Sequence, residues 1–131
     1  MASHDTLGDF LTIIRNGYSA QLSTVGAQWS NIREGVAKIL KDNGYIADYV
    51  KREENALPVL VITLKYVNRV PAITGIKRVS TPGRRVYTGY QEIPKVIGGM
   101  GISILTTSRG LLADRSARQL KTGGELLAQV W

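Results

Sequence analysis

The sequence predicts an α+β protein: an N-terminal α-β-α-β-β domain over residues 1–67, then a mainly β C-terminal domain with a short helix over residues 68–131. Apolar residues recur at helical spacing in two segments of the first half. The second half instead holds short β-branched runs separated by turns that contain Gly or Pro. A hydrophobic content of 44% in 131 residues suffices for a core in one compact domain or in two small ones.

Two amphipathic helices are expected in the first half. Apolar residues at i, i+3, i+4 and i+7 spacing predict the first helix over about residues 5–20. An extended segment over residues 23–29 follows. Ser30 or Asn31 then caps a second helix, which ends at Asn43-Gly44 in the usual left-handed position.

Strands complete the first domain and make up most of the second. β-branched and aromatic residues predict an antiparallel pair over residues 45–50 and 59–66. The strand pattern stops and the charge balance changes at residues 68–71, which predicts the domain boundary. Pro82-Gly83 favours a hairpin turn in which the glycine takes a positive φ. The remaining elements expected in the second domain are strands over 73–79, 84–88, 102–105 and 126–131, and a helix over 115–121 capped by Asp114.

Positive charge is concentrated in the second half of the chain. Up to Tyr66 the sequence has seven Lys+Arg and seven Asp+Glu, whereas from Arg69 onward it has ten and three. The whole formal net charge of +7 therefore lies in the second half. A basic surface of this kind predicts a polyanionic partner, either a nucleic acid or an anionic membrane face, and a nucleic acid is the simpler explanation.

The composition also restricts the compartment. The chain has no cysteine, which excludes disulfides and thiolate metal sites and fits a reducing compartment. No apolar run approaches the roughly 20 residues needed to span a bilayer. The first residues lack the basic region and apolar core of a signal peptide. We therefore expect a cytoplasmic protein without a membrane partner.

One stretch of the second domain carries the best candidates for RNA recognition. Hydroxyl groups both donate and accept hydrogen bonds, and glycines allow close approach of backbone N–H groups, so a bulged or single-stranded RNA is a plausible target. Alternatively, the hydroxyl triplet is only the end of a strand. The candidate residues are Thr106, Thr107, Ser108, Arg109 and Gly110, with Gly123, Gly124 and Glu125 after them.

A second group of candidates combines basic, aromatic and amide side chains. Arg85 and Tyr87 share one face of the predicted strand and Arg84 lies on the other. An arginine can pair with a phosphate while a neighbouring ring stacks on a base. The alternative is a core tyrosine beside solvated arginines. Arg15 and Asn16 lie at the border of the first helix's apolar stripe, where polar side chains are ordinarily only solvated.

Glu125 is unusual in a basic surface because a carboxylate repels phosphates. It could form a structural salt bridge with a neighbouring Arg or Lys. It could also accept a hydrogen bond from a base amino group or a ribose 2′-hydroxyl. The residues alone favour the salt bridge slightly.

Enzymatic activity is not indicated, and no cofactor or metal is expected. His4 is the only histidine, so Ser108 has no evident general base. Gly98-Gly99-Met100-Gly101 fits neither the dinucleotide-binding nor the Walker spacing and is interpreted as a connector. The alternative function is that of a DNA-binding architectural or regulatory protein, for which the helix at 115–121 is short.

The chain resembles the bacterial form of the family of small-subunit ribosomal protein eight along its whole length. Shared segments include Ile14-Arg15-Asn16, Leu64-Lys65-Tyr66 and Arg78-Val79-Ser80. The most specific ones are Thr106 to Gly110, Asp114-Arg115, Ala117-Arg118 and Gly123-Gly124-Glu125. Thr106 and Arg109 stand where the family more often has Ser and Lys, and Ile13 stands where a basic residue is common.

The resemblance implies an α/β N-terminal domain, a mainly β C-terminal domain and a structural role in the small ribosomal subunit. Family members bind the central domain of the small-subunit ribosomal RNA, assist its assembly beside neighbouring ribosomal proteins, and in some bacteria repress their own operon by binding its mRNA. By resemblance, the irregular core of one RNA helix is held by the loop of Thr106, Thr107 and Ser108 together with Gly123, Gly124 and Glu125. Arg84, Arg85 and Tyr87 support it, while Arg15 and Asn16 touch a neighbouring RNA segment.

Overall fold

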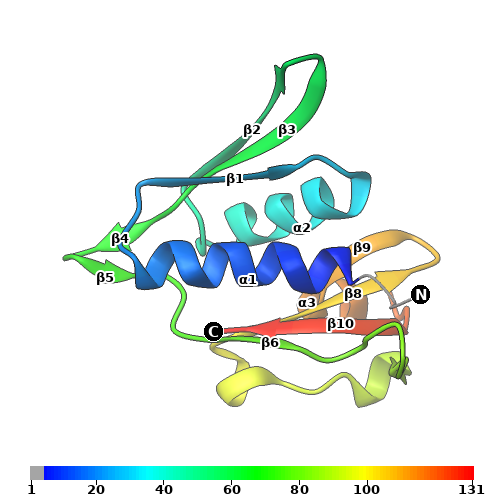
Figure 1. Cartoon of the computed structure of the whole chain (residues 1–131). Helices are drawn as coiled ribbons and strands as arrows, with labels where there is room; N and C mark the ends of the chain where they lie inside the picture. Colours follow the sequence, from blue (N-terminus) through cyan, green and yellow to red (C-terminus); the bar gives the residue numbers. More distant parts are fainter. Residues whose placement is uncertain (1–4) are drawn as a thin grey trace. The chain divides into compact units, whose positions relative to one another are not determined.

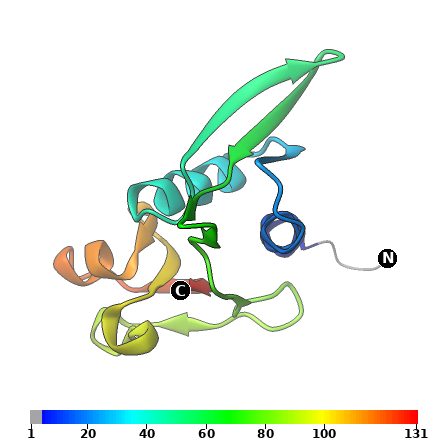
Figure 2. The same ribbon diagram turned by 90° about the vertical axis from the view of Figure 1, so that its left-hand side faces the viewer.

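The computed structural model describes residues 5–131, which form two compact units shown in Figures 1 and 2. The N-terminal unit consists of Asp9–Thr74, and the C-terminal unit consists of Gly75–Trp131 together with residues 5–8. The first unit is α/β and the second is mostly β with one short α-helix, which confirms the predicted α+β class. His4 lies outside the described residues. Among those residues, no helix has the length and apolar character that a membrane crossing requires.

The N-terminal unit follows the predicted order of helices and strands. Its three-stranded antiparallel sheet has the strand order β1-β3-β2, and α1 and α2 lie on the same side of that sheet (Figure 1). A two-stranded hairpin, β4–β5, follows. Apart from residues 6–8 of α1, which belong to the C-terminal unit, the elements are α1 (Thr6–Ser19), β1 (Thr24–Gln28), α2 (Asn31–Asp42), β2 (Asp48–Glu54), β3 (Leu57–Thr63), β4 (Tyr66–Val67) and β5 (Val70–Pro71).

The apolar pattern of this half forms a core between helices and sheet. Val25 lies opposite Ile62 on the buried face of the sheet, and Ala27 and Leu60 form the next buried pair. The predicted apolar stripe of α1 is buried in full, which confirms the helical spacing. It consists of Leu7, Phe10, Leu11, Ile14 and Tyr18.

Local hydrogen bonds set the ends of these elements. Ser30 caps α2, since its Oγ accepts a hydrogen bond from the Arg33 N–H at 3.2 Å. The next strand, β2, begins only at Asp48, later than the sequence predicts. The Tyr45 N–H donates to the Leu40 carbonyl at 2.8 Å, so Tyr45 closes the turn that follows α2 and is not part of the strand.

A small hairpin occupies the segment where the strand pattern of the sequence stops. Tyr66 pairs with Pro71 and Val67 with Val70. Asn68 and Arg69, with φ of 52° and 67°, form the turn between them. Strand pairing therefore continues through the segment in which the sequence predicts none.

The C-terminal unit is an antiparallel sheet built around the last strand of the chain. β10 pairs with β6, β7 and β8, and β9 pairs with the outer side of β8. The elements are β6 (Ile76–Arg78), β7 (Tyr87–Thr88), the 3-10 turns η1 (Tyr90–Glu92) and η2 (Val96–Gly99), β8 (Ile102–Thr107), β9 (Gly110–Ala113), α3 (Asp114–Gln119) and β10 (Gly124–Val130).

One face of this sheet carries the core of the C-terminal unit. Leu105 on β8, Leu126 on β10 and Ala117 on α3 are buried together with Ile93. Partly buried apolar residues pack around this cluster, among them Val79, Val86, Tyr90 and Leu112. The cluster keeps β8 and β10 aligned, and these two strands carry four of the predicted RNA-binding residues, namely Thr106, Thr107, Gly124 and Glu125.

The structure corrects three predictions for this unit. The strands on either side of Pro82-Gly83 do not form a hairpin with each other, because both pair with β10, and only Thr81 and Arg84 form an isolated bridge. Gly83 does not take a positive φ. Strand β9 has no counterpart in the prediction.

The cap of α3 also differs from the prediction. Ala113 occupies the N-cap position without a side-chain hydrogen bond, and Asp114 is the first helical residue. The buried Asp114 carboxylate instead pairs with Arg118 one turn later at 3.0 Å. The short side chain thus serves an intrahelical ion pair.

We predict that Gly124→Ala destabilises the C-terminal unit by about 1–3 kcal/mol. A Cβ at this position would collide with the Thr106 carbonyl, which is backbone and cannot rotate away, so β8 and β10 would have to separate. Chemical denaturation of the full chain measures the effect.

Gly83→Ala is the matched control for this substitution. A Cβ there meets no atom within 4 Å, so its stability should stay within about 0.5 kcal/mol of wild type. Equal stability of the two variants would contradict the predicted collision.

Candidate nucleic-acid interface

Strand register brings three of the predicted RNA-binding residues into one row. Tyr87 on β7 lies opposite Glu125 on β10, which lies opposite Thr106 on β8. Side chains of directly opposed residues point to the same face of a sheet. The ring, the carboxylate and the hydroxyl therefore project side by side, although they lie far apart in the sequence.

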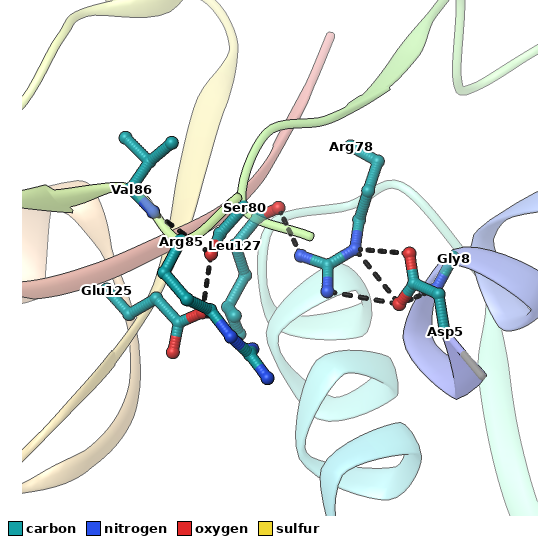
Figure 3. Close-up of polar contacts among 8 residues, drawn as sticks. All are labelled: Asp5, Gly8, Arg78, Ser80, Arg85, Val86, Glu125 and Leu127. Carbon is teal, nitrogen blue, oxygen red and sulfur yellow. Dashed lines mark hydrogen bonds and ion pairs between the residues drawn. The ribbon is translucent and has the colours of Figure 1, made fainter. Parts of the chain in front are cut away.

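The Glu125 carboxylate is the centre of a polar cluster on this face. Figure 3 shows the Ser80 and Arg85 side chains converging on it. Its Oε2 accepts a hydrogen bond from Ser80 Oγ at 2.5 Å and another from Arg85 Nη1 at 3.0 Å. The side chain of Glu125 is only 14% exposed, whereas that of Arg85 is 49% exposed. The structural salt bridge that the residues alone favour is therefore present.

The surroundings of Glu125 keep it charged. Burial by itself raises the pKa of this carboxyl, but the hydrogen bonds from Ser80 and Arg85 outweigh it. The positive charges of Arg85 and Arg78 lower the pKa further, and the net result is a value below the ordinary one. Glu125 therefore presents a carboxylate at neutral pH.

Arg78 forms a second polar cluster beside the first (Figure 3). Its guanidinium donates to the Asp5 carboxylate at 3.1 Å and to the Leu127 carbonyl at 2.7 Å. Burial raises the pKa of Asp5, but hydrogen bonds from Arg78 and the Gly8 N–H lower it below its ordinary value. Arg78 thus joins the residues before α1 to strand β10 within the C-terminal unit.

The three hydroxyl residues Thr106, Thr107 and Ser108 have different roles. Thr107 Oγ1 accepts from the Arg109 N–H at 3.0 Å and donates to the Gly110 carbonyl at 2.9 Å, so it closes the turn between β8 and β9. Ser108 is exposed at the tip of that turn and Thr106 is half-buried. Within residues 5–131, neither of these two hydroxyls has a hydrogen-bond partner. They are the ones available to a ligand.

The paired glycines have a structural reason to be glycine. A Cβ on Gly123 would collide with the Thr88 carbonyl, and one on Gly124 would collide with the Thr106 carbonyl. Both residues therefore let β10 lie close to β7 and β8. The sequence-based interpretation is that these glycines let a ligand approach the backbone closely. Packing within the sheet is enough to explain why both positions are glycine.

The basic and aromatic candidates differ in how exposed their side chains are and in whether they form ion pairs within the protein. Tyr87 is 70% exposed, so the alternative of a core tyrosine is wrong. Arg84 and Arg109 are exposed, and their side chains have no ion-pair partner in the described part of the chain. Arg118 is different, because its guanidinium pairs with Asp114 and donates to the Ile93 carbonyl at 3.1 Å.

Arg15 and Asn16 belong to the N-terminal unit. Both are exposed on α1, next to the buried Ile14 and Gly17. The structure thus leaves both side chains at the surface, as their place at the border of the apolar stripe predicts.

The family of this chain is decided by comparison with known proteins. The family model described as Ribosomal protein S8 matches residues 5–131. The chain belongs to the ribosomal protein S8 family. Members of this family are structural constituents of the ribosome and not enzymes, which confirms both the resemblance and the non-enzymatic prediction. The ribosome is accordingly its place of action, and ribosomal RNA and ribosomal proteins are its partners.

Named relatives cover almost the whole chain. Small ribosomal subunit protein uS8 of Opitutus terrae is 52% identical over 128 residues, covering 97% of this chain and 98% of that protein. The protein of the same name from Thioalkalivibrio sulfidiphilus is 49% identical, with 99% of each chain covered. Small ribosomal subunit protein uS8c of Psilotum nudum is 42% identical over 131 residues, covering 98% of this chain and 99% of that protein.

Sequence reasoning did not select Ser80, Arg78 or Asp5 as contributors to this S8 surface. Ser80 is fully buried and 45 positions from Glu125, so no local pattern indicates their contact. The available signal is the family resemblance, which includes Asp5 and the segment Arg78-Val79-Ser80.

We predict that Glu125→Gln lowers the free energy of unfolding by about 1 kcal/mol at neutral pH, a value reduced for the solvent exposure of Arg85. Because the folded-state pKa of Glu125 lies below the unfolded-state value, its charge contributes fully above the unfolded-state pKa. That contribution is lost as the pH falls through the folded-state pKa. The stability difference between wild type and variant should therefore shrink in acid, as denaturation at a series of pH values will show.

Glu92→Gln is the control, since Glu92 is exposed in the same unit. This variant should follow the wild-type curve within about 0.5 kcal/mol at every pH. A difference for Glu125→Gln that stays constant into the acid range would contradict the assigned charge effect.

Proposed function

We propose that this S8 protein is a constituent of the small ribosomal subunit that binds the central domain of small-subunit ribosomal RNA as a primary binding protein. The single observation that carries the proposal is the row Tyr87–Glu125–Thr106, with a ring, a carboxylate and a hydroxyl on one face beside Arg85. The relatives' name, small ribosomal subunit protein, supports the assignment to that subunit.

RNA binding combines a long-range electrostatic attraction with short-range contacts. The net charge of +7, all of it contributed by the second half of the sequence, attracts the phosphate backbone from a distance and without regard to sequence. Hydrogen bonds and stacking at the row act only on contact, and they select a particular RNA shape. An irregular helix with a splayed base meets both requirements.

Each available group has a counterpart on a ribonucleotide. The exposed Tyr87 ring offers a face on which a base can stack. Ser108 and Thr106 offer hydroxyls that donate to or accept from base edges and sugars. The second carboxylate oxygen of Glu125 accepts from a ribose 2′-hydroxyl, while Arg84 and Arg109 pair with phosphates.

The remaining residues of the predicted set extend the contact. Gly123 and Gly124 keep the two strands of the row close together, and Gly110 permits the left-handed turn behind Ser108 with φ of 97°. Arg15 and Asn16 on α1 contact a neighbouring RNA segment. Neighbouring small-subunit proteins bind other faces of the chain, and an mRNA element folded like the ribosomal site competes for the row and represses translation.

Chemical footprinting of the purified RNA central domain tests the proposal directly. Protection should concentrate on one irregular helix and disappear when that helix is replaced by regular duplex. Competition by duplex DNA at equal concentration separates the proposal from a DNA-binding function. Equal affinity for the DNA would overturn it.

We expect Ser108→Ala to cost about 1–3 kcal/mol of specific RNA binding, because a buried polar group of the RNA loses its partner. Binding to an unrelated duplex should change little. Filter binding or fluorescence anisotropy with both RNAs gives the comparison. Ser23→Ala, an exposed serine of the N-terminal unit, is the control. Equal losses on both RNAs would show that Ser108 does not contribute to recognition.

Salt dependence should report the number of phosphate contacts. If about five to seven phosphates are neutralised, log Kd should change with log salt by a slope of about 3.5 to 5, at roughly 0.7 for each contact. Arg84→Gln and Arg109→Gln should each flatten the slope by about 0.7. Arg52→Gln on β2, also exposed, should leave it unchanged. A slope that no C-terminal arginine affects would be incompatible with this electrostatic contact.

A further inference from the structure

We propose that Ser80 is a positioning residue for RNA recognition, which orients the Glu125 carboxylate so that one of its oxygens and the Arg85 guanidinium face the RNA together. This inference rests on the proposed function and names a residue that acts through another. The ligand class is a ribonucleotide segment that offers a hydroxyl donor and a phosphate acceptor side by side.

The hydroxyl of Ser80 can point in only one direction. Ser80 is fully buried, with 0% exposure, so no solvent competes for its hydroxyl. Its Oγ accepts a hydrogen bond from the Val86 N–H at 3.2 Å. The single hydroxyl proton is therefore left for Glu125 Oε2, which lies 2.5 Å away. Donor and acceptor roles are both assigned by geometry.

The backbone holds Ser80 at a constant place relative to Glu125. The Ser80 N–H donates to the Leu126 carbonyl at 3.1 Å, and the Leu126 N–H donates to the Val86 carbonyl at 2.9 Å. Leu126 follows Glu125 directly, so both ends of the 80–86 segment are bonded to the strand that carries the carboxylate. Ser80 cannot move away from Glu125 without breaking these bonds.

This arrangement determines what Glu125 and Arg85 present outward. Oε2 serves both Ser80 and Arg85 Nη1, while Oε1 has no hydrogen-bond partner in the described residues. Without the serine hydroxyl, the carboxylate would be free to rotate and pair with Arg85 through both oxygens, the geometry that guanidinium groups favour. That pairing would occupy Glu125 Oε1, the acceptor offered to the RNA, and a second N–H donor of the Arg85 guanidinium. The serine keeps both available.

The same unit offers a matched control. Ser103 is also fully buried, and its Oγ donates to the Pro94 carbonyl at 3.1 Å, not to Glu125. Ser103→Ala therefore removes a comparable buried hydrogen bond without affecting the carboxylate. A role of Ser80 in folding alone predicts that the two substitutions behave alike in RNA binding.

The experiment is a double-mutant cycle on the full chain, with dissociation constants measured for a central-domain transcript and for an unrelated duplex of equal length. The variants are Ser80→Ala, Glu125→Gln, the double variant and Ser103→Ala, each verified as folded by circular dichroism and denaturation. Ser80→Ala should weaken target binding about tenfold and duplex binding less than about twofold. In the Glu125→Gln background the same substitution should cost less than about twofold.

Several outcomes would overturn the inference while leaving the proposed function in place. An unchanged ratio of target to duplex affinity in Ser80→Ala is one. A full tenfold loss in the Glu125→Gln background is another, because Ser80 would then act by a different route. A loss of discrimination by Ser103→Ala equal to that of Ser80→Ala is a third. Wild-type protein that does not prefer the target transcript would instead overturn the proposed function itself.

Discussion

The pairing of β10 with β8 and β7 is the constraint on which the C-terminal unit depends. Glu125 meets Thr106 on one side and Tyr87 on the other, and this register alone places the three side chains on a common face. The close approach of the strands requires hydrogen in place of a side chain at Gly123 and Gly124. Had β10 shifted by one residue against β7 and β8, the Glu125 carboxylate would point to the opposite face of the sheet. The chemistry of the surface is therefore a consequence of strand register.

A partly buried carboxylate in a basic, RNA-directed surface is unfavourable unless its partners compensate for its charge. Ser80 and Arg85 both donate to one oxygen of Glu125, and this offsets the cost of removing the charge from water. The same pairing restricts the motion of Arg85, a long side chain that would otherwise lose conformational entropy when RNA binds. Glu125 is thus both part of the recognition surface and the group that preorganises its neighbour.

Much of the fold follows from local patterns, because helical spacing and β-branched runs act over a few residues. The buried stripe of α1 and the Ser30 cap are of this kind. The pairing of β6 and β7 with the same strand is not, since it depends on partners such as Gly124 and Ala128, which lie far along the chain from Thr88 and Arg78. The same holds for the site: sequence indicated Thr106, Ser108 and Tyr87, but not Ser80, whose role exists only through the distant Glu125. The separate role of Thr107 arises where β8 turns into β9, a strand that the sequence did not predict.

The charge that attracts RNA and the charges that contact it belong to partly different residues. Arg78, Arg85 and Arg118 each form an ion pair within the protein, with Asp5, Glu125 and Asp114 respectively. These pairs contribute little to the field at a distance, because each is nearly neutral as a unit. The long-range attraction therefore comes from other side chains, such as the exposed Arg84 and Arg109. Removing a paired arginine should change shape and specificity, whereas removing an exposed one should change mainly affinity and its dependence on salt.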